Sequence, residues 1–242
     1  MHSTPCISRP QVTDSQRREM LLLIAAEKER RARNKIDSFF PEKGPFRREL
    51  YKPHLEFFAA GARYRTRVFL AGNRTGKTIA GAYELTLHLT GIYPQWWEGK
   101  RFSHPIRAVA ASDTGKTTRE VIQQELLGQP GRFGTGMVPY DLLEKSTMRS
   151  GVTDAVDTCY IKYASGGFST LIFKSYEQKR ESFQGLSLEF GWLDEECPEQ
   201  IFDETLTRMA TTGGCLALTF TPLQGLTPLI QRFLPGGIST AD

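Results

Sequence analysis

The sequence predicts an α/β fold in which a mainly parallel sheet is flanked by helices. Two short apolar runs, residues 67–71 and 106–111, are each followed by a stretch of helical character, residues 78–90 and 117–127. Strands that alternate with helices in this way form parallel sheets with crossover helices. The third observation is a Gly-Lys-Thr near each of the two strand-to-helix junctions, because this tripeptide is the core of phosphate-binding loops.

The composition is that of an ordinary globular protein and argues against several other classes. Of the 242 residues, 39% are hydrophobic and 24% are charged, and the formal net charge is +4. This mild basic excess is compatible with a polyanionic partner without requiring one, because nucleic-acid binding depends on a local patch. No stretch approaches the roughly 20 apolar residues of a membrane helix. The four cysteines have no zinc-site spacing.

The N-terminal part of the chain predicts a tail and a charged helix. Residues 1–13 are rich in Pro, Ser and Thr and are expected to be disordered, whereas residues 14–36 read as one helix capped by Asp14 or Ser15. This helix carries seven Lys/Arg against three glutamates. It fits either a solvated surface helix or an arm that contacts DNA or a neighbouring subunit. A Pro/Gly break at residues 39–46 separates it from the main domain.

The pattern changes in the second half of the chain. Residues 158–164 and 168–174 alternate in polarity around Ser-Gly-Gly and predict an antiparallel hairpin. Residues 215–222 predict a last buried strand, and residues 226–234 a last short helix. The expected segments are an N-terminal tail and charged helix over residues 1–40, an α/β domain over residues 41–235, and a linker-like tail over residues 236–242.

Two loops compete for the phosphate, and neither matches the full template, since Ala71 and Ala110 stand where its first glycine belongs. The first loop contributes Gly72 and the cation Arg74. The second contributes Asp113, whose charge would repel a triphosphate at a cost of about 1 kcal/mol or more. We therefore expect the first loop to bind nucleotide, with an ordinary βα turn as its alternative, and the second to be a capped helix start. The residues expected around the phosphates are Gly72, Asn73, Arg74, Thr75, Gly76, Lys77 and Thr78.

Acidic residues follow the predicted strand that ends near residue 194. Hydrolysis of a nucleotide requires one carboxylate that helps to hold Mg²⁺ and a second that activates water. Strand alternation would put Asp194 and Glu195 on opposite sides of the chain. Asp194, together with Thr78, is then the expected metal site and Glu195 the general base, which Glu196 replaces if the strand ends one residue later. The alternative is an acidic helix N-terminus.

The last predicted strand ends in Thr-Phe-Thr-Pro. This sequence places the hydroxyls of Thr219 and Thr221 at the same sheet edge as Lys77 and Asp194, where ligands bind in open α/β sheets. Such hydroxyls can sense the γ-phosphate. The alternative is that threonine simply forms strands well.

Five segments, in this order, resemble the ATPase domain of tailed-phage large terminase subunits: "LYKPHLEFFAAG", "FLAGNRTGKT", "KSYEQKRESFQG", "WLDEE" and "LTFTPLQG". The resemblance covers about residues 45–235. It implies an additional-strand, RecA-like P-loop NTPase with a hairpin insertion, in which ATP hydrolysis drives double-stranded viral DNA into a procapsid. The cofactors that it implies are ATP and Mg²⁺.

The resemblance also implies roles for individual residues. In that family the segment before the loop holds adenine, which maps onto Tyr51, Pro53 and His54, where the family more often has glutamine at the last position. A loop arginine acts on the γ-phosphate, and Arg74 is its match. The segment from Thr219 to Thr221 resembles the motif that couples hydrolysis to movement.

The partners implied by the resemblance are double-stranded DNA, a portal protein, a small terminase subunit and further copies of the chain. The copies are expected to form a pentameric ring when active, with a monomer as the alternative for the isolated chain. The expected location is the host cytoplasm, away from any membrane. Family members continue into a ribonuclease-H-type nuclease domain, whereas this chain stops at "FLPGGISTAD", so we expect no endonuclease activity from it.

Two other functions stay open at this point. One is a helicase-type motor, which would need a second RecA-like domain to supply an arginine finger. The other is a nucleotide-binding scaffold without turnover. Arg119, Arg180 and Arg208 are candidate fingers that act on a neighbour's ATP, and the alternative for each is a surface or hairpin-packing role.

Overall fold

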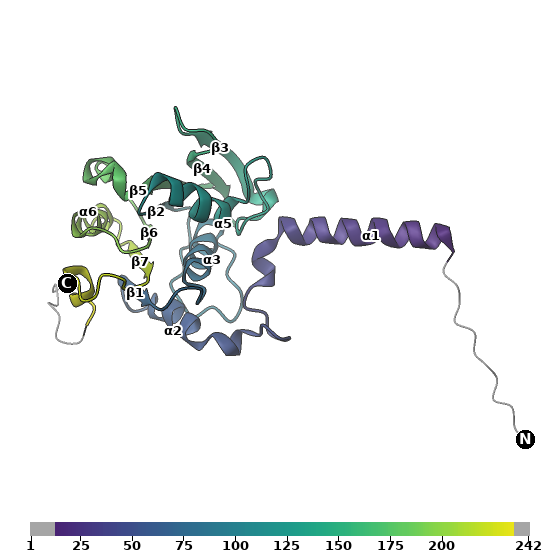
Figure 1. Cartoon of the computed structure of the whole chain (residues 1–242), viewed down its shortest axis with the longest axis horizontal. Helices are drawn as coiled ribbons and strands as arrows, with labels where there is room; N and C mark the ends of the chain where they lie inside the picture. Colours follow the sequence, from purple (N-terminus) through teal and green to yellow (C-terminus); the bar gives the residue numbers. More distant parts are fainter. Residues whose placement is uncertain (1–12, 235–242) are drawn as a thin grey trace, which may run out of the picture.

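The computed structural model describes residues 13–234, which form a seven-stranded sheet with helices on both faces (Figure 1). The strand order is β1-β7-β6-β2-β5-β4-β3. The first five of these strands are parallel, and the last two continue the sheet in antiparallel fashion. The strands are β1 (Thr66–Leu70), β2 (Arg107–Ser112), β3 (Leu143–Met148), β4 (Val156–Lys162), β5 (Phe168–Ser175), β6 (Phe190–Asp194) and β7 (Cys215–Phe220).

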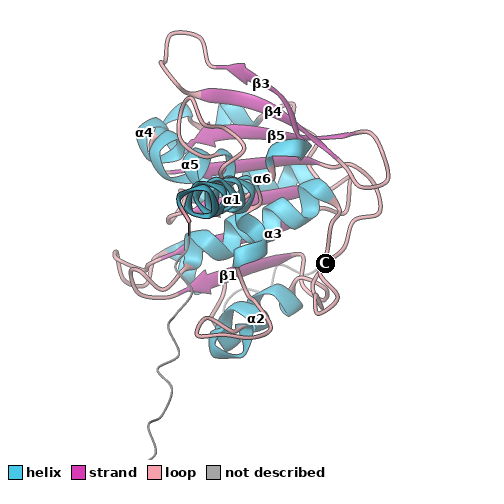
Figure 2. Ribbon diagram, turned by 90° about the vertical axis from the view of Figure 1, so that its right-hand side faces the viewer, coloured by secondary structure: helices cyan, strands magenta, loops and turns pink. Residues whose placement is uncertain are grey.

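The helices divide between the two faces of the sheet. Figure 2 looks onto the face that carries α3, while Figure 1 shows α6 on the opposite side of the strands. The helices are α1 (Asp14–Arg33), α2 (Lys52–Ala60), α3 (Lys77–Thr90), α4 (Gly115–Thr117), α5 (Gln124–Leu127), α6 (Glu199–Met209) and α7 (Pro228–Gln231). The π-helix η3 (Thr118–Gln123) joins α4 to α5, and the 3₁₀ turns are η1 (Lys35–Ser38), η2 (Arg48–Tyr51), η4 (Tyr140–Leu142), η5 (Tyr176–Gln178) and η6 (Arg180–Phe183).

The parallel strands are buried on both faces, as expected for a sheet covered by crossover helices. In β2, Ala108 and Ala110 belong to the core cluster shared with α3 and α5. Val109 and Ala111 belong to the cluster shared with α6 and α7. Successive residues of a strand face opposite sides, so each short apolar run in the sequence supplies both cores.

The predicted alternation of strands and helices is confirmed, and three local expectations are corrected. The hairpin forms from β4 and β5, but β3 was not expected, because this exposed edge strand has no apolar alternation to reveal it. The helix expected over residues 117–127 starts at Gly115 and has a π-helical middle. The last helix is only the single turn of α7.

Helix α1 extends away from the body of the molecule, as Figure 1 shows. Thr13, rather than Asp14 or Ser15, caps it through a capping box with Gln16, and the helix ends at Arg33 instead of residue 36. None of its residues is buried, and the apolar side chains from Met20 to Ile24 are 45–72% exposed. Within residues 13–234, no helix is long and apolar enough to cross a membrane.

Two expected tails cannot be compared with this fold. The tail expected over residues 1–13 lies, apart from Thr13, outside the described residues, and so does the tail expected over residues 236–242.

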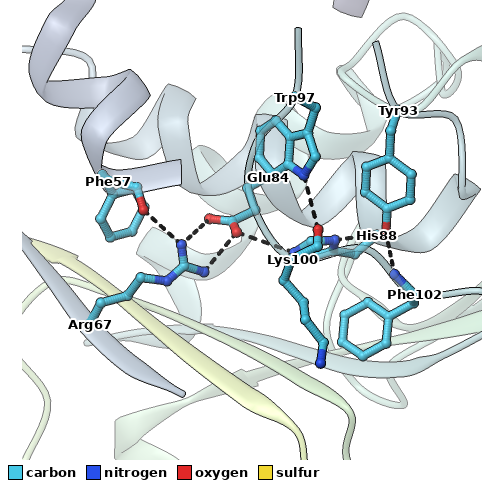
Figure 3. A network of polar contacts seen from close by, with 8 residues as sticks. All are labelled: Phe57, Arg67, Glu84, His88, Tyr93, Trp97, Lys100 and Phe102. Carbon is cyan, nitrogen blue, oxygen red and sulfur yellow. Dashed lines mark hydrogen bonds and ion pairs between the residues drawn. The ribbon is translucent and has the colours of Figure 1, made fainter. Parts of the chain in front are cut away.

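A buried polar network joins β1, α2 and α3 (Figure 3). Both terminal nitrogens of the Arg67 guanidinium donate to the Glu84 carboxylate, at 2.7 and 3.1 Å, and one of them also donates to the Phe57 carbonyl. Glu84 also lies 3.2 Å from His88 Nε2, and His88 Nδ1 lies 3.0 Å from the Tyr93 hydroxyl. The network thus links α3, which follows the first loop, to β1 and to α2.

Candidate functional site

The first loop lies between β1 and α3 and is shaped to receive an anion. Arg74 and Gly76 adopt left-handed conformations, with φ of 60° and 85°. In the part of the chain that the structure describes, no oxygen accepts a hydrogen bond from the backbone N–H groups of residues 73–78. Free amides at such a turn and at the start of a helix favour phosphate binding.

The lysine of this loop is largely buried. The Lys77 side chain is 8% exposed, and its ammonium donates to the Gly72 carbonyl at 2.6 Å. A buried ammonium requires an oxygen partner, and here the loop itself supplies one. Phosphate oxygens at the same place would give the ammonium an anionic partner instead of a neutral one.

The carboxylate of Asp194 lies at the end of β6 beside the start of α3. Thr78 donates to it at 3.1 Å, and Thr219 donates to it at 2.6 Å. The indole N–H of Trp192 in turn donates to the Thr219 hydroxyl at 2.7 Å. The three elements β6, β7 and α3 are therefore linked by one chain of hydrogen bonds that ends on this carboxylate.

Asp194 suits a magnesium ion. Burial raises its pKa to about 7 and the charge of Glu195 adds to the rise, which hydrogen bonds from two threonines and the Lys77 charge oppose only in part. The carboxylate and the Thr78 hydroxyl are hard oxygen ligands of the kind that Mg²⁺ binds together with substrate phosphates. Among residues 13–234 no group of three or more His, Cys, Asp and Glu is placed to hold a metal ion.

Glu195 differs from the expected strand residue. Strand β6 ends at Asp194, and Glu195 adopts a left-handed conformation with φ of 65°. The Asp194 and Glu195 side chains therefore diverge because the backbone turns after the end of β6, and not because of strand alternation. Burial and the charge of Asp113 raise the pKa of Glu195, and the nearby Lys77 ammonium opposes this rise. Its carboxylate thus shares an environment with the loop lysine.

The neighbouring acid is turned elsewhere. One carboxylate oxygen of Glu196 accepts from the Thr227 hydroxyl, which also caps α7. The other oxygen is buried without a hydrogen-bond partner in the described residues. Helix α6 begins only at Glu199, so Asp194 and Glu195 are not part of a helix N-terminus. The geometry favours Glu195 over Glu196 as the acid that faces the loop.

The two threonines at the end of β7 contact other site residues. Besides binding Asp194, Thr219 is 1% exposed, so its hydroxyl acts within the core rather than at an open surface. Thr221 lies past the strand end and donates to the Asn73 side chain at 2.9 Å. Thr219 is thereby linked to Asp194 and Thr221 to the first loop.

Tyr51 and His54 meet the loop at a pocket of about 310 Å³. His54 is 7% exposed, burial lowers its pKa, and its Nδ1 has no hydrogen-bond partner in the described residues. A side chain at Gly76 would come within 3.0 Å of His54 Nε2, so the glycine also permits this contact. The pocket is apolar in the main and is lined by, among others, Phe39, Phe40, Phe46, Tyr51, His54 and Arg74.

The second Gly-Lys-Thr is engaged by the protein itself. The Thr114 side chain accepts from the backbone N–H of Thr117 and caps α4. The backbone N–H of Gly115 donates to the Glu177 carboxylate at 2.8 Å. An amide that already binds a carboxylate is not free for phosphate. The interpretation as a capped helix start therefore agrees with the geometry.

The four candidate arginines differ in whether other residues of the chain engage their side chains. Arg74 is exposed at the rim of the pocket. Arg119 contacts Glu120 and the Thr153 carbonyl, while Arg180 and Arg208 lie 2.6 and 3.0 Å from the oxygens of the Glu204 carboxylate. The last three arginines are thus engaged within the chain.

Sequence reasoning missed two residues around the acids and gave a third a different role. The Trp192 indole donates to Thr219, and the Tyr176 hydroxyl lies 2.8 Å from the Asp194 carbonyl oxygen. Asp113, which the sequence showed only as a charge in the second loop, also raises the pKa of Glu195. Trp192 and Tyr176 belong to "WLDEE" and "KSYEQKRESFQG", two of the segments that carry the family resemblance. The sequence does not indicate which residues these two side chains contact.

At one edge of the parallel sheet lie a loop with unpaired backbone amides, the buried Lys77 and the Thr78–Asp194 pair. Together with the sheet, these features define a P-loop NTPase fold. The profile of the family described as "Terminase large subunit, T4likevirus-type, N-terminal" matches residues 68–238. This chain belongs to that family.

Individual relatives come from the same class of phage proteins. The large terminase subunit of Salmonella phage P22 is 32% identical over 243 residues, which cover 92% of this chain and 47% of the relative. The chain therefore spans about half the length of this curated relative. The large terminase of a thermophilic bacteriophage is similar in structure, with a TM-score of 0.47 and 14% identity over 70% of this chain and 38% of its own. The same thermophilic phage protein in complex with ADP gives a TM-score of 0.46 at 14% identity over the same shares of the two chains.

Proposed function

We propose that this chain is the ATP-hydrolysing motor domain of a large terminase, which drives double-stranded viral DNA into a procapsid. The observation that carries the proposal is the convergence of Lys77, the Thr78–Asp194 pair and Glu195 at one sheet edge. Binding alone would need only the loop. Hydrolysis additionally requires a second acid near the lysine, to orient the attacking water.

The residues divide the work between binding and chemistry. The amides of residues 73–78 and the Lys77 ammonium would hold the β- and γ-phosphates, while Thr78 and Asp194 would hold Mg²⁺. When bound, this ion neutralises charge that develops on the phosphate oxygens. Glu195 orients the attacking water and accepts its proton, for which a raised pKa is suited. We assign the γ-phosphate contact to Arg74, the exposed cation of the loop.

The base of the nucleotide would occupy the pocket next to the loop. Tyr51 and His54 line it together with Arg74 and Gly76 of the loop, and this shared lining supports a single ligand with its phosphates in the loop and its base in the pocket. Thr219 and Thr221 link the metal acid and the loop to β7, which is the arrangement that a coupling element needs.

The wider role follows from the family. Double-stranded DNA, a portal protein, a small terminase subunit and a ring of copies of this chain are the partners we propose, in the host cytoplasm. Two simple activity patterns separate this role from the alternatives. Double-stranded DNA should stimulate ATP turnover; stimulation by single strands alone would favour a helicase-type motor, and binding without turnover a scaffold.

The assignment of the base is tested by the Glu195→Gln variant. The amide has nearly the same shape but cannot accept the proton of water, so kcat should fall by roughly 100-fold or more while ATP still binds. ATP turnover and nucleotide affinity are the measurements. Glu196→Gln is the matched control and should retain most of the wild-type kcat, because Glu196 is turned toward Thr227. Equal effects of the two variants would remove the assignment.

A further inference from the structure

Tyr176 is a buried tyrosine at the end of β5, a strand that β2 separates from the site strand β6. It follows β5 directly, opens the turn η5 and is 7% exposed. Its ring packs in the core cluster that includes Ala111 of β2 and Leu193 of β6. The side chain thus extends from the end of β5 past β2, its neighbour in the sheet, to the end of β6.

The hydroxyl of Tyr176 meets three backbone carbonyls. It lies 2.8 Å from the Asp194 oxygen, 3.1 Å from the Glu195 oxygen and 3.4 Å from the Ala111 oxygen. A phenol has one proton to donate, and a buried hydroxyl is costly unless that proton is donated. The two shortest contacts are both to the segment that carries the acids of the site.

The backbone at Glu195 needs such a contact. A left-handed conformation is unfavourable for a residue with a side chain and persists only where the surroundings hold it. The N–H of Glu195 donates to the Thr219 carbonyl at 2.9 Å. The Tyr176 hydroxyl lies 2.8 Å from the Asp194 carbonyl oxygen and 3.1 Å from the Glu195 carbonyl oxygen, on either side of the Glu195 backbone, so contacts from Thr219 and Tyr176 together hold the turn.

We propose that Tyr176 is a positioning residue for hydrolysis: its hydroxyl holds the Asp194 and Glu195 carbonyls, so that the Glu195 carboxylate stays beside Lys77. This inference rests on the proposed ATPase function. Tyr176 contacts the backbone carbonyls of Asp194 and Glu195 and no residue of the phosphate loop, and it affects hydrolysis through the position of the Glu195 carboxylate. Its loss should therefore reduce the chemical step and leave nucleotide binding intact, because the loop and Lys77 are unchanged.

The test compares Tyr176→Phe with Tyr163→Phe. Tyr163 is equally buried, at 6% exposure, and its hydroxyl donates to the Phe102 carbonyl at 2.6 Å, far along the chain from the acids. Both variants keep the ring and lose one buried hydrogen bond. We expect kcat to fall roughly tenfold in Tyr176→Phe, with KM and ATP affinity unchanged, and to stay at the wild-type value in Tyr163→Phe.

A double variant separates positioning from general loosening of the fold. If Tyr176 acts through Glu195, adding Tyr176→Phe to Glu195→Gln should cause no further loss of kcat. Amide hydrogen exchange in the peptide that contains residues 193–197 should be faster in Tyr176→Phe and unchanged in Tyr163→Phe.

Three results would overturn the inference: a wild-type kcat in Tyr176→Phe, the same loss in the Tyr163→Phe control, or an additive loss in the double variant. A wild-type chain without any ATP turnover would instead overturn the proposed function, and this inference with it.

Discussion

Burial of the Asp194 carboxylate makes its ionised form unfavourable in the folded protein. Asp194 is 2% exposed, and burial raises its pKa to about 7, whereas an aspartate in an unfolded chain titrates near 4. Between these two values the folded state binds a proton that the unfolded state has already released. The free energy of unfolding therefore falls as the pH rises through this window.

The Asp194→Asn variant removes that charge and should stabilise the apo protein above neutral pH. The amide can accept from Thr219 and meet the Thr78 hydroxyl, so the packing is kept. Its advantage in unfolding free energy over wild type should widen between pH 5 and pH 8 by up to roughly 3 kcal/mol, the two pH units up to the raised pKa. Thermal unfolding with a chelator present measures this. An advantage that is the same at both pH values would contradict it.

The loop residues could be predicted from the sequence, whereas the details around Glu195 could not. Gly-Lys-Thr after an apolar strand has a chemical meaning that does not depend on the rest of the fold, and Gly72, Arg74 and Asp113 together favoured the first copy over the second. The turn at Glu195 depends on contacts with Thr219 and Tyr176, which are distant in the sequence. Alternation in a strand says nothing about the residue after its end.

At the scale of elements, the network of Figure 3 joins three of them. Arg67 is 5% exposed and Glu84 is fully buried, and each provides the main charged partner of the other. Breaking a buried ion pair by removing one partner leaves an uncompensated charge in the core, which costs about 3–5 kcal/mol.

Glu84→Ala should therefore destabilise the domain by about 3 kcal/mol or more, measured by chemical denaturation. Glu27→Ala is the matched control, since Glu27 forms ion pairs with Arg30 and Arg31 on the exposed surface of α1. That control should leave the midpoint unchanged. Equal midpoints for the two variants would mean that the buried pair does not hold β1 against α3.

The elements that could be predicted are those with a pattern. The hairpin of β4 and β5 alternates in polarity, and the first turn of α3 follows a glycine in a recognisable motif. Strand β3 pairs with β4 at the sheet edge, with mostly exposed side chains, so only its backbone partner defines it. Tertiary pairing of this kind leaves no trace in the residue order.

At the scale of the whole molecule, α1 stands apart from the domain (Figure 1). Its contacts with the body include the Arg33 guanidinium over the Tyr140 ring, at 4.3 Å, and a 3.7 Å approach between Glu29 and Arg132. Both lie at the surface. A helix that buries none of its residues contributes little to the stability of the remaining fold.

A chain that lacks residues 1–33 should accordingly keep the thermal midpoint and the basal ATP turnover of the full chain. The apolar side chains from Met20 to Ile24 are then removed without opening any core. Differential scanning calorimetry and a turnover assay provide the comparison. A drop of several degrees in the midpoint would show that α1 does pack against the domain.

The strand order also has a consequence for folding during synthesis on the ribosome. Strand β1 pairs only with β7 in the described sheet, Thr66 opposite Leu216, so its partner is synthesised last among the strands. The loop at residues 72–78 emerges early but cannot meet Asp194 and Thr219 until translation of nearly the whole domain is complete. During that interval the backbone N–H and C=O groups of β1 have no strand to pair with, and an unpaired strand edge of this kind makes a folding chain prone to aggregation.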